Sequence, residues 1–171
     1  QVEEIRGFTP IEEEVSEFLA EYVKRGEFPA PNPGERFAEI WRMRFAWWWN
    51  DNPFFHEDTL KAFLLRTGEG KLVGFHGFIP CDYERDGVII PSLIATSFLV
   101  AEGYRDASLG FSMKMKKLAA SHHIVDGGPS PKLREILDRF QFQSCCGGSQ
   151  YYYFAQKNGW HPRNVVARAS T

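Results

Sequence analysis

The stretch from Val100 to Gly110, VAEGYRDASLG, joins a strongly apolar segment to an amphipathic one that carries lysines. It is rich in small residues, and no large apolar side chain stands between Tyr104 and Leu109. A helix that begins after such a stretch exposes its first backbone N–H groups, and the helix dipole adds partial positive charge there. A phosphate or pyrophosphate can bind these groups, and Arg105 can pair with its oxygens. The alternative is a tight strand-to-helix connection with a surface arginine.

Metal and cysteine chemistry are not indicated. The five histidines lack the spacing of a metal-binding pair, so we expect no metal site. Three cysteines, of which Cys145 and Cys146 are neighbours, do not suggest a disulfide framework and favour a reducing compartment. A nucleophilic cysteine would need a base beside it, so we expect this pair to serve buried packing.

Aromatic residues make up 15% of the chain, and Trp47 to Trp49 are consecutive. Neighbouring helical residues point about 100° apart, so three in a row cannot all face one core. Trp41, Phe45 and Trp48 continue the buried stripe of a helix, which leaves Trp47 or Trp49 to line a groove. Such a ring could stack on a planar or sugar-like ligand.

The hydrophobic period changes along the chain. Predicted strands are 2–8, 62–67, 71–83, 88–100, 122–128 and a closing hairpin of 142–146 with 150–156. Predicted helices are 10–25, 34–50, 108–121 and 131–140. Turns at 68–70 and 84–87 make the three middle strands antiparallel, whereas strand 122–128 follows a helix and should be parallel to its neighbour.

Local signals set the ends of several elements. Thr9 and Glu12 form a capping box for the first helix, and Gly26 ends it. Pro91 lacks an N–H donor, so it should mark the start of strand 88–100 or a bulge in it. This strand is apolar on both faces, as expected of a strand that helices cover on both sides.

Length and composition indicate one globular domain. The chain has 171 residues, 43% apolar and 25% charged, with a formal charge of −2. These values are ordinary for a globular protein and give no global field for binding nucleic acid. We find no secretory segment and no apolar run of about 18 residues, so we expect a cytoplasmic protein without a membrane partner. We assign 1–159 to the domain and 160–171 to a tail or linker.

The order of elements and the stretch 100–110 resemble the GCN5-related N-acetyltransferase superfamily. Its signature Val-x-Pro-x-x-Arg/Gln-x-x-Gly-x-Gly/Ala is matched by Val100, Arg105 and Gly110, whereas Glu102 replaces the proline and Ser108 the first glycine. The resemblance covers about residues 2–157. It implies an α/β (α+β) fold with a mixed, mostly antiparallel sheet and helices on both faces. The fourth and fifth strands would splay apart to admit the pantetheine arm of an acyl-coenzyme A.

The resemblance also implies roles for individual residues. Main-chain groups of Leu99 and Val100 would bind pantetheine, and an amide at this strand's end would polarise the thioester carbonyl. The pyrophosphate would lie beside Arg105, on the backbone amides of Asp106, Ala107, Ser108, Leu109 and Gly110. Ser130 stands where the family has an asparagine that completes the coenzyme site. Leu137 stands where the family commonly has a tyrosine that protonates the departing thiolate.

The general base is less well marked. An amine must be neutral to attack, so a carboxylate, a histidine or a water chain must take its proton. Asp126, at the end of the fifth predicted strand, is the first candidate, and His76 and Glu102 follow. Tyr152 could replace the missing acid; alternatively the thiolate departs unassisted, since thiols have pKa values near 8.5.

The sequence therefore predicts an N-acyltransferase that uses acetyl-coenzyme A, or another acyl-coenzyme A, and a small acceptor with a primary amine in a ternary complex. The acceptor would enter over residues 26–36 and the tryptophan-rich helix. The alternative is a catalytically weak or inactive binding module, or an interaction domain of a larger polypeptide, to which the missing tyrosine and altered loop point. A homodimer is left open.

Overall fold

The computed structural model describes residues 1–26, 36–126 and 128–142. In this part of the chain, five strands form one sheet in the spatial order β1-β2-β3-β4-β5. The strands are β1 (Val2–Arg6), β2 (Leu60–Arg66), β3 (Leu72–Arg85), β4 (Val88–Val100) and β5 (His123–Asp126). Strands β1 to β4 are antiparallel neighbours, and β5 runs parallel to β4. The predicted mixed sheet is confirmed.

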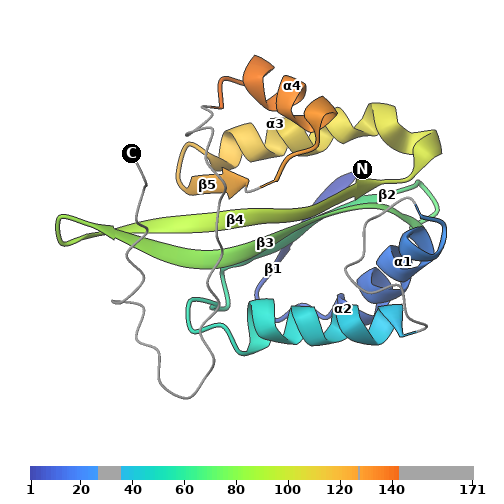
Figure 1. The fold of residues 1–171 in the computed structure, drawn as a ribbon, viewed down its shortest axis with the longest axis horizontal. Coiled ribbons are helices and arrows are strands. Elements are labelled where there is room, and N and C mark those ends of the chain that lie inside the picture. Colours follow the sequence, from blue (N-terminus) through green and yellow to red (C-terminus); the bar gives the residue numbers. More distant parts are fainter. Residues whose placement is uncertain (27–35, 127, 143–171) are drawn as a thin grey trace.

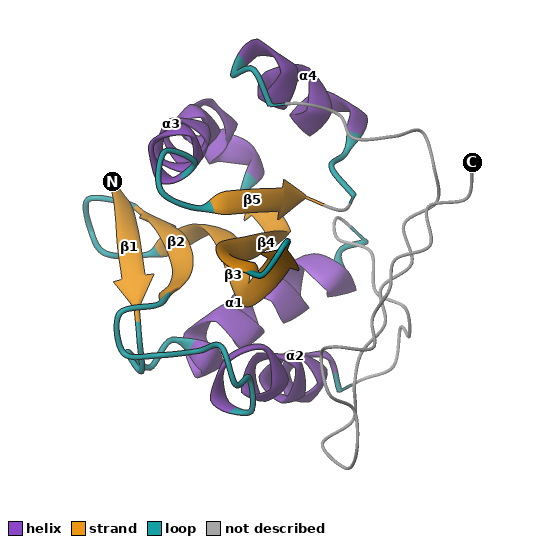
Figure 2. Cartoon of the chain, turned by 90° about the vertical axis from the view of Figure 1, so that its left-hand side faces the viewer, coloured by secondary structure: helices purple, strands orange, loops and turns teal. Residues whose placement is uncertain are grey.

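Helices cover both faces of the sheet (Figures 1 and 2). α1 (Glu12–Lys24) and α2 (Phe37–Phe45) lie on one face, and α2 continues into a π-helical turn over Ala46–Asn50. The other face carries α3 (Leu109–Leu118), preceded by a 3-10 turn over Glu102–Ser108, and α4 (Pro131–Arg139). Among the described residues, no helix is long and apolar enough to span a membrane. The predicted hairpin and tail lie outside the described residues beyond Phe142.

The start of α1 differs from the predicted capping box. Ile11 is the residue before the helix, and the Glu12 carboxylate accepts a hydrogen bond from the Ile11 N–H at 2.8 Å. Thr9 does not cap the helix, because its hydroxyl donates to the Arg6 carbonyl at 2.9 Å. The buried Lys61 on β2 donates to the Thr9 carbonyl at 3.0 Å and to Glu12 at 2.6 Å. Lys61, which is distant in sequence, thus binds both Thr9 and Glu12, the two residues of the expected capping box.

An aromatic core fills the space between the sheet and the α1/α2 layer. Trp48 is buried, as predicted, and Trp47 is 39% exposed. The prediction that Trp49 could line a groove is wrong, because this side chain is only 1% exposed. Its ring stacks on Phe45 at 4.7 Å between centroids and 8° between planes. The wide π-helical turn, closed by an Asp51 N–H to Ala46 carbonyl bond of 2.8 Å, lets two adjacent tryptophans enter the core.

The same turn protects a free edge of β3. The pairing of β2 with β3 ends at Ala62 opposite Gly77, so the next carbonyls of β3 have no partner from β2. The Trp49 indole N–H donates to the Phe78 carbonyl at 2.9 Å, and the Asn52 amide donates to the Pro80 carbonyl at 3.0 Å. Two side chains thus satisfy carbonyl groups that a strand would otherwise bind.

The β3–β4 hairpin extends beyond the helical layers (Figure 1). Its turn at 84–87 is confirmed, with Asp86 and Gly87 at positive φ. The expectation that β4 is covered on both faces along its length is wrong, because Val88 and Ile89 are 62% and 54% exposed. β5 pairs with β4 only from Ser92 onward, so within the described ranges the first residues of β4 have β3 as their one neighbouring strand.

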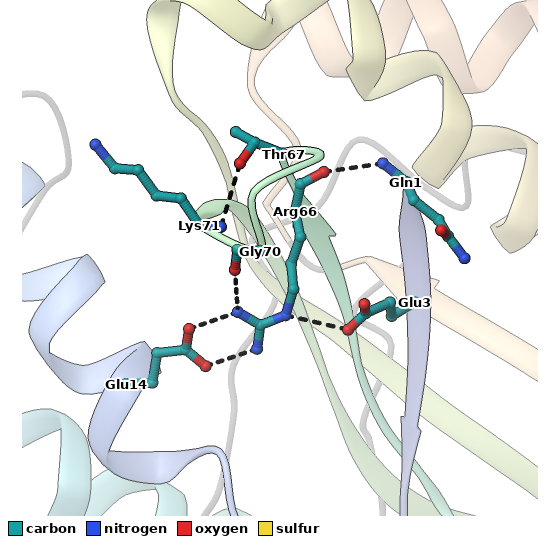
Figure 3. Close-up of polar contacts among 7 residues, drawn as sticks. All are labelled: Gln1, Glu3, Glu14, Arg66, Thr67, Gly70 and Lys71. Carbon is teal, nitrogen blue, oxygen red and sulfur yellow. Dashed lines mark hydrogen bonds and ion pairs between the residues drawn. The ribbon is translucent and has the colours of Figure 1, made fainter.

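Arg66 ties three elements together at the opposite end of the sheet (Figure 3). Its guanidinium forms a two-point contact with Glu14 of α1 at 2.5 and 2.7 Å, and it also donates to Glu3 of β1 at 3.1 Å. A further bond of 3.1 Å reaches the Gly70 carbonyl in the β2–β3 turn. The hydrogen bonds from Arg66 lower the pKa of the Glu14 carboxyl, although partial burial opposes them.

Arg66→Met is expected to destabilise the protein by about 1–2 kcal/mol. Hydrogen bonds to charged groups contribute about 1.5–3 kcal/mol, and we place the loss near the lower end because both glutamates are partly exposed. The measurement is urea unfolding at low and high salt. Arg66→Lys is the matched variant, and it should recover less than half of the loss, because an ammonium cannot bind Glu14 at two points. Full recovery by lysine would contradict the two-point contact.

Candidate active site

The most irregular part of the sheet is a β-bulge in β4. Phe75 of β3 lies opposite Leu99, whereas Gly77, two residues on, lies opposite Thr96. The single residue between them in β3, His76, therefore faces two residues of β4, Ser97 and Phe98. Ser97 adopts a left-handed backbone with φ of 54°. The bulge does not fall at Pro91, which stands in register opposite Asp82.

Beyond the bulge, β4 separates from β5. Their pairing runs from Ser92 opposite His123 to Ala95 opposite Asp126 and then stops, whereas β4 continues to Val100. Among the described residues, no strand pairs with the β5-facing edge of β4 after Ala95. The predicted splaying of the fourth and fifth strands is confirmed. Leu99 and Val100, the predicted pantetheine contacts, both lie on this stretch. The Ala101 N–H bonds the Val73 carbonyl of β3 at 2.8 Å, and main-chain groups alternate between the two edges of a strand. The main chain of Leu99 therefore also faces β3, opposite Phe75, and that of Val100 faces the unpaired edge.

The connection from β4 to α3 is more helical than the sequence suggests. The predicted helix starts at Ser108, but a 3-10 turn already begins at Glu102, and the Tyr104 N–H bonds the Ala101 carbonyl at 2.9 Å. In such a turn each N–H points at the carbonyl three residues earlier. The amides of Asp106 and Ala107 are therefore directed into the turn. α3 follows this turn without a break, and the Leu109 N–H bonds the Ala107 carbonyl. The predicted phosphate site at 106–110 remains a prediction.

The charges around this connection are mixed. Arg105 is exposed, and its guanidinium lies 3.7 Å from the Glu102 carboxylate, so it forms only a loose ion pair. Glu102 and Asp106 are both exposed carboxylates on the same turn. Ser108, at the start of α3, makes no capping hydrogen bond with its side chain. The carboxylates of Glu102 and Asp106 therefore offset the positive charge that Arg105 brings to this turn.

Gly110 has a packing role as well. A Cβ atom at this position would lie 3.0 Å from the Val2 side chain, so α3 approaches β1 closely there. A larger residue at Gly110 would therefore disturb the contact between α3 and the edge strand, whatever it does to a ligand.

Asp126 ends β5 beside the point where the strands separate. Burial raises the pKa of its carboxyl, and a 3.2 Å hydrogen bond from the Gly128 N–H partly opposes this shift. A carboxylate with a raised pKa is a reasonable proton acceptor for an amine. Ser130 caps α4, because its hydroxyl accepts the Leu133 N–H at 3.3 Å. That Ser130 also contributes to a coenzyme site stays a prediction.

His76, the second acid–base candidate, lies opposite the bulge residues Ser97 and Phe98. His76 is buried between Phe78, Phe98 and Phe111, and burial lowers its pKa to about 3. Leu137 is buried in the core beneath α4. Tyr152, Cys145, Cys146 and the acceptor loop at 27–35 lie outside the described residues. Within the described ranges, no group of three or more potential metal ligands occurs.

The sequence analysis missed the two hydroxyl residues of the bulge, Thr96 and Ser97. The side-chain oxygens of these neighbours lie 3.4 Å apart, and both residues are half-buried. The available signal was weak: they form a polar interruption in the apolar run from Leu93 to Val100.

No protein-family model and no curated protein matches this sequence. Solved structures do match the fold. An acetyltransferase of Trypanosoma brucei is 15% identical, with a TM-score of 0.54, over 90% of this chain and 99% of that chain. Glucosamine-6-phosphate N-acetyltransferase of Arabidopsis thaliana is 12% identical, with a TM-score of 0.56, over 90% and 99%. A predicted acetyltransferase of Clostridium acetobutylicum, solved with acetyl-coenzyme A, is 11% identical, with a TM-score of 0.52, over 89% and 95%.

These likenesses span nearly the whole of each compared chain. Identities of 11–15% support a statement about the fold and not about the acceptor. The chain has the fold of the GCN5-related N-acetyltransferases.

Proposed function

We propose that this protein is an acyl-coenzyme A-dependent N-acyltransferase that moves an acetyl group to a primary amine. The observation that carries the proposal is the β4 bulge at Ser97 together with the separation of β4 from β5 after Ala95. In the described part of the chain, this arrangement leaves main-chain groups of β4 after Ala95 without a strand partner on the side that faces β5. A pantetheine arm carries amide groups that can pair with such an edge, as a peptide does in strand addition.

In this proposal the acyl-coenzyme A supplies an activated thioester, and the chain orients it. Val100 binds the arm through its main chain, which faces the unpaired edge of β4, and the start of α3 faces the pyrophosphate. The amine nitrogen bonds to the carbonyl carbon, the carbon–sulfur bond breaks, and sulfur leaves as thiolate. Asp126 takes the proton from the amine; the thiolate needs no acid from Leu137, which is buried.

The acceptor would approach from the α1/α2 side. Trp47, at 39% exposure, is the tryptophan of the 47–49 run that is accessible there. An exposed indole on this face suits an apolar, planar or sugar-like amine. The proposed compartment remains the cytoplasm, on the basis of the cysteine content.

A non-catalytic binding module is the second candidate. It is favoured by the carboxylates of Glu102 and Asp106 on the turn that would meet the pyrophosphate, because like charges repel. Titration with acetyl-coenzyme A and with desulfo-coenzyme A separates the possibilities. Binding of both with turnover of the former supports the enzyme, binding without turnover supports the module, and the absence of binding removes both.

Ala107→Asp is expected to weaken coenzyme binding at least tenfold, about 1.4 kcal/mol. Ala107 is exposed, so the change disturbs no packing, and a carboxylate near a helix start favours the helix itself. Calorimetric titration with acetyl-coenzyme A measures the effect. The matched control is Ala119→Asp, exposed at the other end of α3, which should change the dissociation constant less than twofold. Equal affinities for both variants would remove the phosphate site from the start of α3.

A further inference from the structure

The bulge residue Ser97 holds a backbone conformation that glycine would adopt more easily. Its φ of 54° lies in the left-handed region. Residues other than glycine, asparagine and aspartate adopt this conformation only at a cost in conformational energy. Two other described residues besides glycine, Asp86 and Gln141, share positive φ. Asp86 lies in a tight hairpin turn and Gln141 follows the end of α4, where such values are common. Ser97 lies within a strand, so the bulge itself would be more stable with glycine.

The bulge therefore does not explain why position 97 carries a serine and not a glycine. Its Oγ lies 3.4 Å from the Oγ1 of Thr96, and the two hydroxyls make no other hydrogen bond within the described part of the chain. By contrast, the Ser92 hydroxyl on the same strand is satisfied by the Ile90 carbonyl at 2.9 Å. The pair Thr96 and Ser97 is thus a half-buried group with spare donor capacity.

Thr96 packs against β3, and this contact sets the direction of the hydrogen bond between the Thr96 and Ser97 hydroxyls. It lies opposite Gly77, where an added Cβ would come within 3.5 Å of the Thr96 methyl group and 2.8 Å of the Phe75 ring. The absence of a side chain at Gly77 accommodates both neighbours. When the Thr96 hydroxyl donates to Ser97, the Ser97 proton is free to point elsewhere, and the bond it receives strengthens it as a donor.

Ser97 lies two residues beyond Ala95, which forms with Asp126 the last pair between β4 and β5. We propose that the Ser97 hydroxyl donates a hydrogen bond to the thioester carbonyl oxygen of the acyl-coenzyme A and to the oxyanion that forms from it. This inference rests on the proposed function, because it assigns a further catalytic residue to the same site.

The chemical role is electrostatic. As the nucleophile bonds to the carbonyl carbon, the π electron pair moves to oxygen, which becomes negative. Collapse of this intermediate restores the carbonyl and breaks the carbon–sulfur bond, and the thiolate then takes a proton. A preorganised donor stabilises the developing charge more than the neutral carbonyl, so its removal lowers the rate more than the affinity.

The test uses acetyl-coenzyme A with water as the acceptor, so no amine need be identified. Three quantities are measured: affinity for acetyl-coenzyme A, affinity for coenzyme A, and thiol release by hydrolysis. Ser97→Gly relieves the backbone strain and removes the hydroxyl, whereas Ser97→Ala removes only the hydroxyl. Asp86→Gly relieves a smaller strain of the same kind at the exposed hairpin turn, because aspartate tolerates positive φ better than serine, and it is the control for the backbone effect.

We expect Ser97→Gly and Ser97→Ala to lower thiol release tenfold or more and to reduce the preference for acetyl-coenzyme A over coenzyme A about fivefold. The melting temperature should rise in Ser97→Gly and Asp86→Gly and stay near the parent's in Ser97→Ala. Thr96→Val should give a smaller loss of the same kind. If the parent shows no detectable hydrolysis, the test rests on the ratio of the affinities for acetyl-coenzyme A and coenzyme A, compared between the parent and the Ser97 variants.

Two results would overturn the inference while leaving the proposed function in place. One is a parent that binds both coenzymes with equal affinity. The other is a Ser97→Gly variant whose thiol release and affinity ratio both stay within twofold of the parent's. A parent that binds neither coenzyme removes the proposed function itself, so the two failures are distinguishable.

Discussion

Trp49→Ala is expected to destabilise the protein by about 4–5 kcal/mol, at the upper end of tryptophan truncations in cores. The indole is 1% exposed, stacks on Phe45, and lies under the ammonium of Lys61 at 4.7 Å. Its removal also takes the hydrogen bond from the Phe78 carbonyl, which no strand partner from β2 can replace. A loss of this size should lower the melting temperature of a chain of this length by roughly 10–20 °C.

Two variants separate the parts of this effect. Trp49→Phe keeps most of the ring contacts and loses the N–H donor, so it should cost about 1–3 kcal/mol. Trp47→Ala, next along the chain and 39% exposed, should cost less than about 1 kcal/mol. Urea unfolding of the three variants beside the parent gives the comparison. If Trp47→Ala were as damaging as Trp49→Ala, the π-helical placement of these rings would be wrong.

Elements whose ends have local causes could be predicted from the sequence. The turn at 84–87 depends on Asp86 and Gly87, which accept positive φ. The start of α4 depends on Ser130 and Pro131, since the serine hydroxyl caps the Leu133 N–H and proline needs no partner at the first position. In both cases the residues that decide the structure are neighbours in the sequence.

Features with distant causes could not be predicted. α1 begins at Glu12 because Lys61, which lies 49 residues away, holds the Thr9 carbonyl and the Glu12 carboxylate. The bulge at Ser97 depends on the register between two strands, and no turn residue marks it. Proline at position 91 drew the prediction to the wrong part of β4, although a strand edge without a neighbour tolerates it.

The candidate site shows the same division. The separation of β4 from β5 after Ala95 was expected from the resemblance to known acetyltransferases and is confirmed. The pantetheine contacts of Leu99 and Val100 stay a prediction. The phosphate-binding amides do not follow as simply, because small residues such as Gly103 and Ala107 permit a 3-10 turn as readily as an open loop. Composition indicated that no bulky group blocks this position. It could not indicate where the backbone N–H groups point.

The second large effect is expected at His76 and appears as a dependence of stability on pH. Its imidazole is 1% exposed, packs against Phe78, Phe98 and Phe111, and neither ring nitrogen has a hydrogen-bond partner in the described structure. Burial without a partner disfavours the charged ring and lowers its pKa to about 3, from an ordinary value near 6.5.

The sign of the effect follows from proton binding. Between about pH 6.5 and pH 3 the unfolded chain binds a proton at His76 that the folded protein does not bind. Acid therefore favours unfolding, and this histidine removes up to about 1.4 kcal/mol of stability for each pH unit below 6.5. Above pH 6.5 the ring is neutral in both states and contributes no pH dependence.

His76→Leu, which has nearly the same side-chain volume, is expected to abolish this contribution. At pH 7 the variant should be at least as stable as the parent, because two buried unsatisfied nitrogen atoms are removed at the cost of some ring contacts. At pH 4.5 it should exceed the parent by about a further 2–3 kcal/mol. The measurement is urea unfolding of both proteins from pH 4.5 to 7.5, and the difference between them cancels the titration of carboxyl groups such as Glu12 and Asp126. Parallel pH curves would show that His76 is protonated in the folded state or is paired with a group that stabilises its charge. That result would place a polar partner within a pocket that the structure lines with phenylalanines.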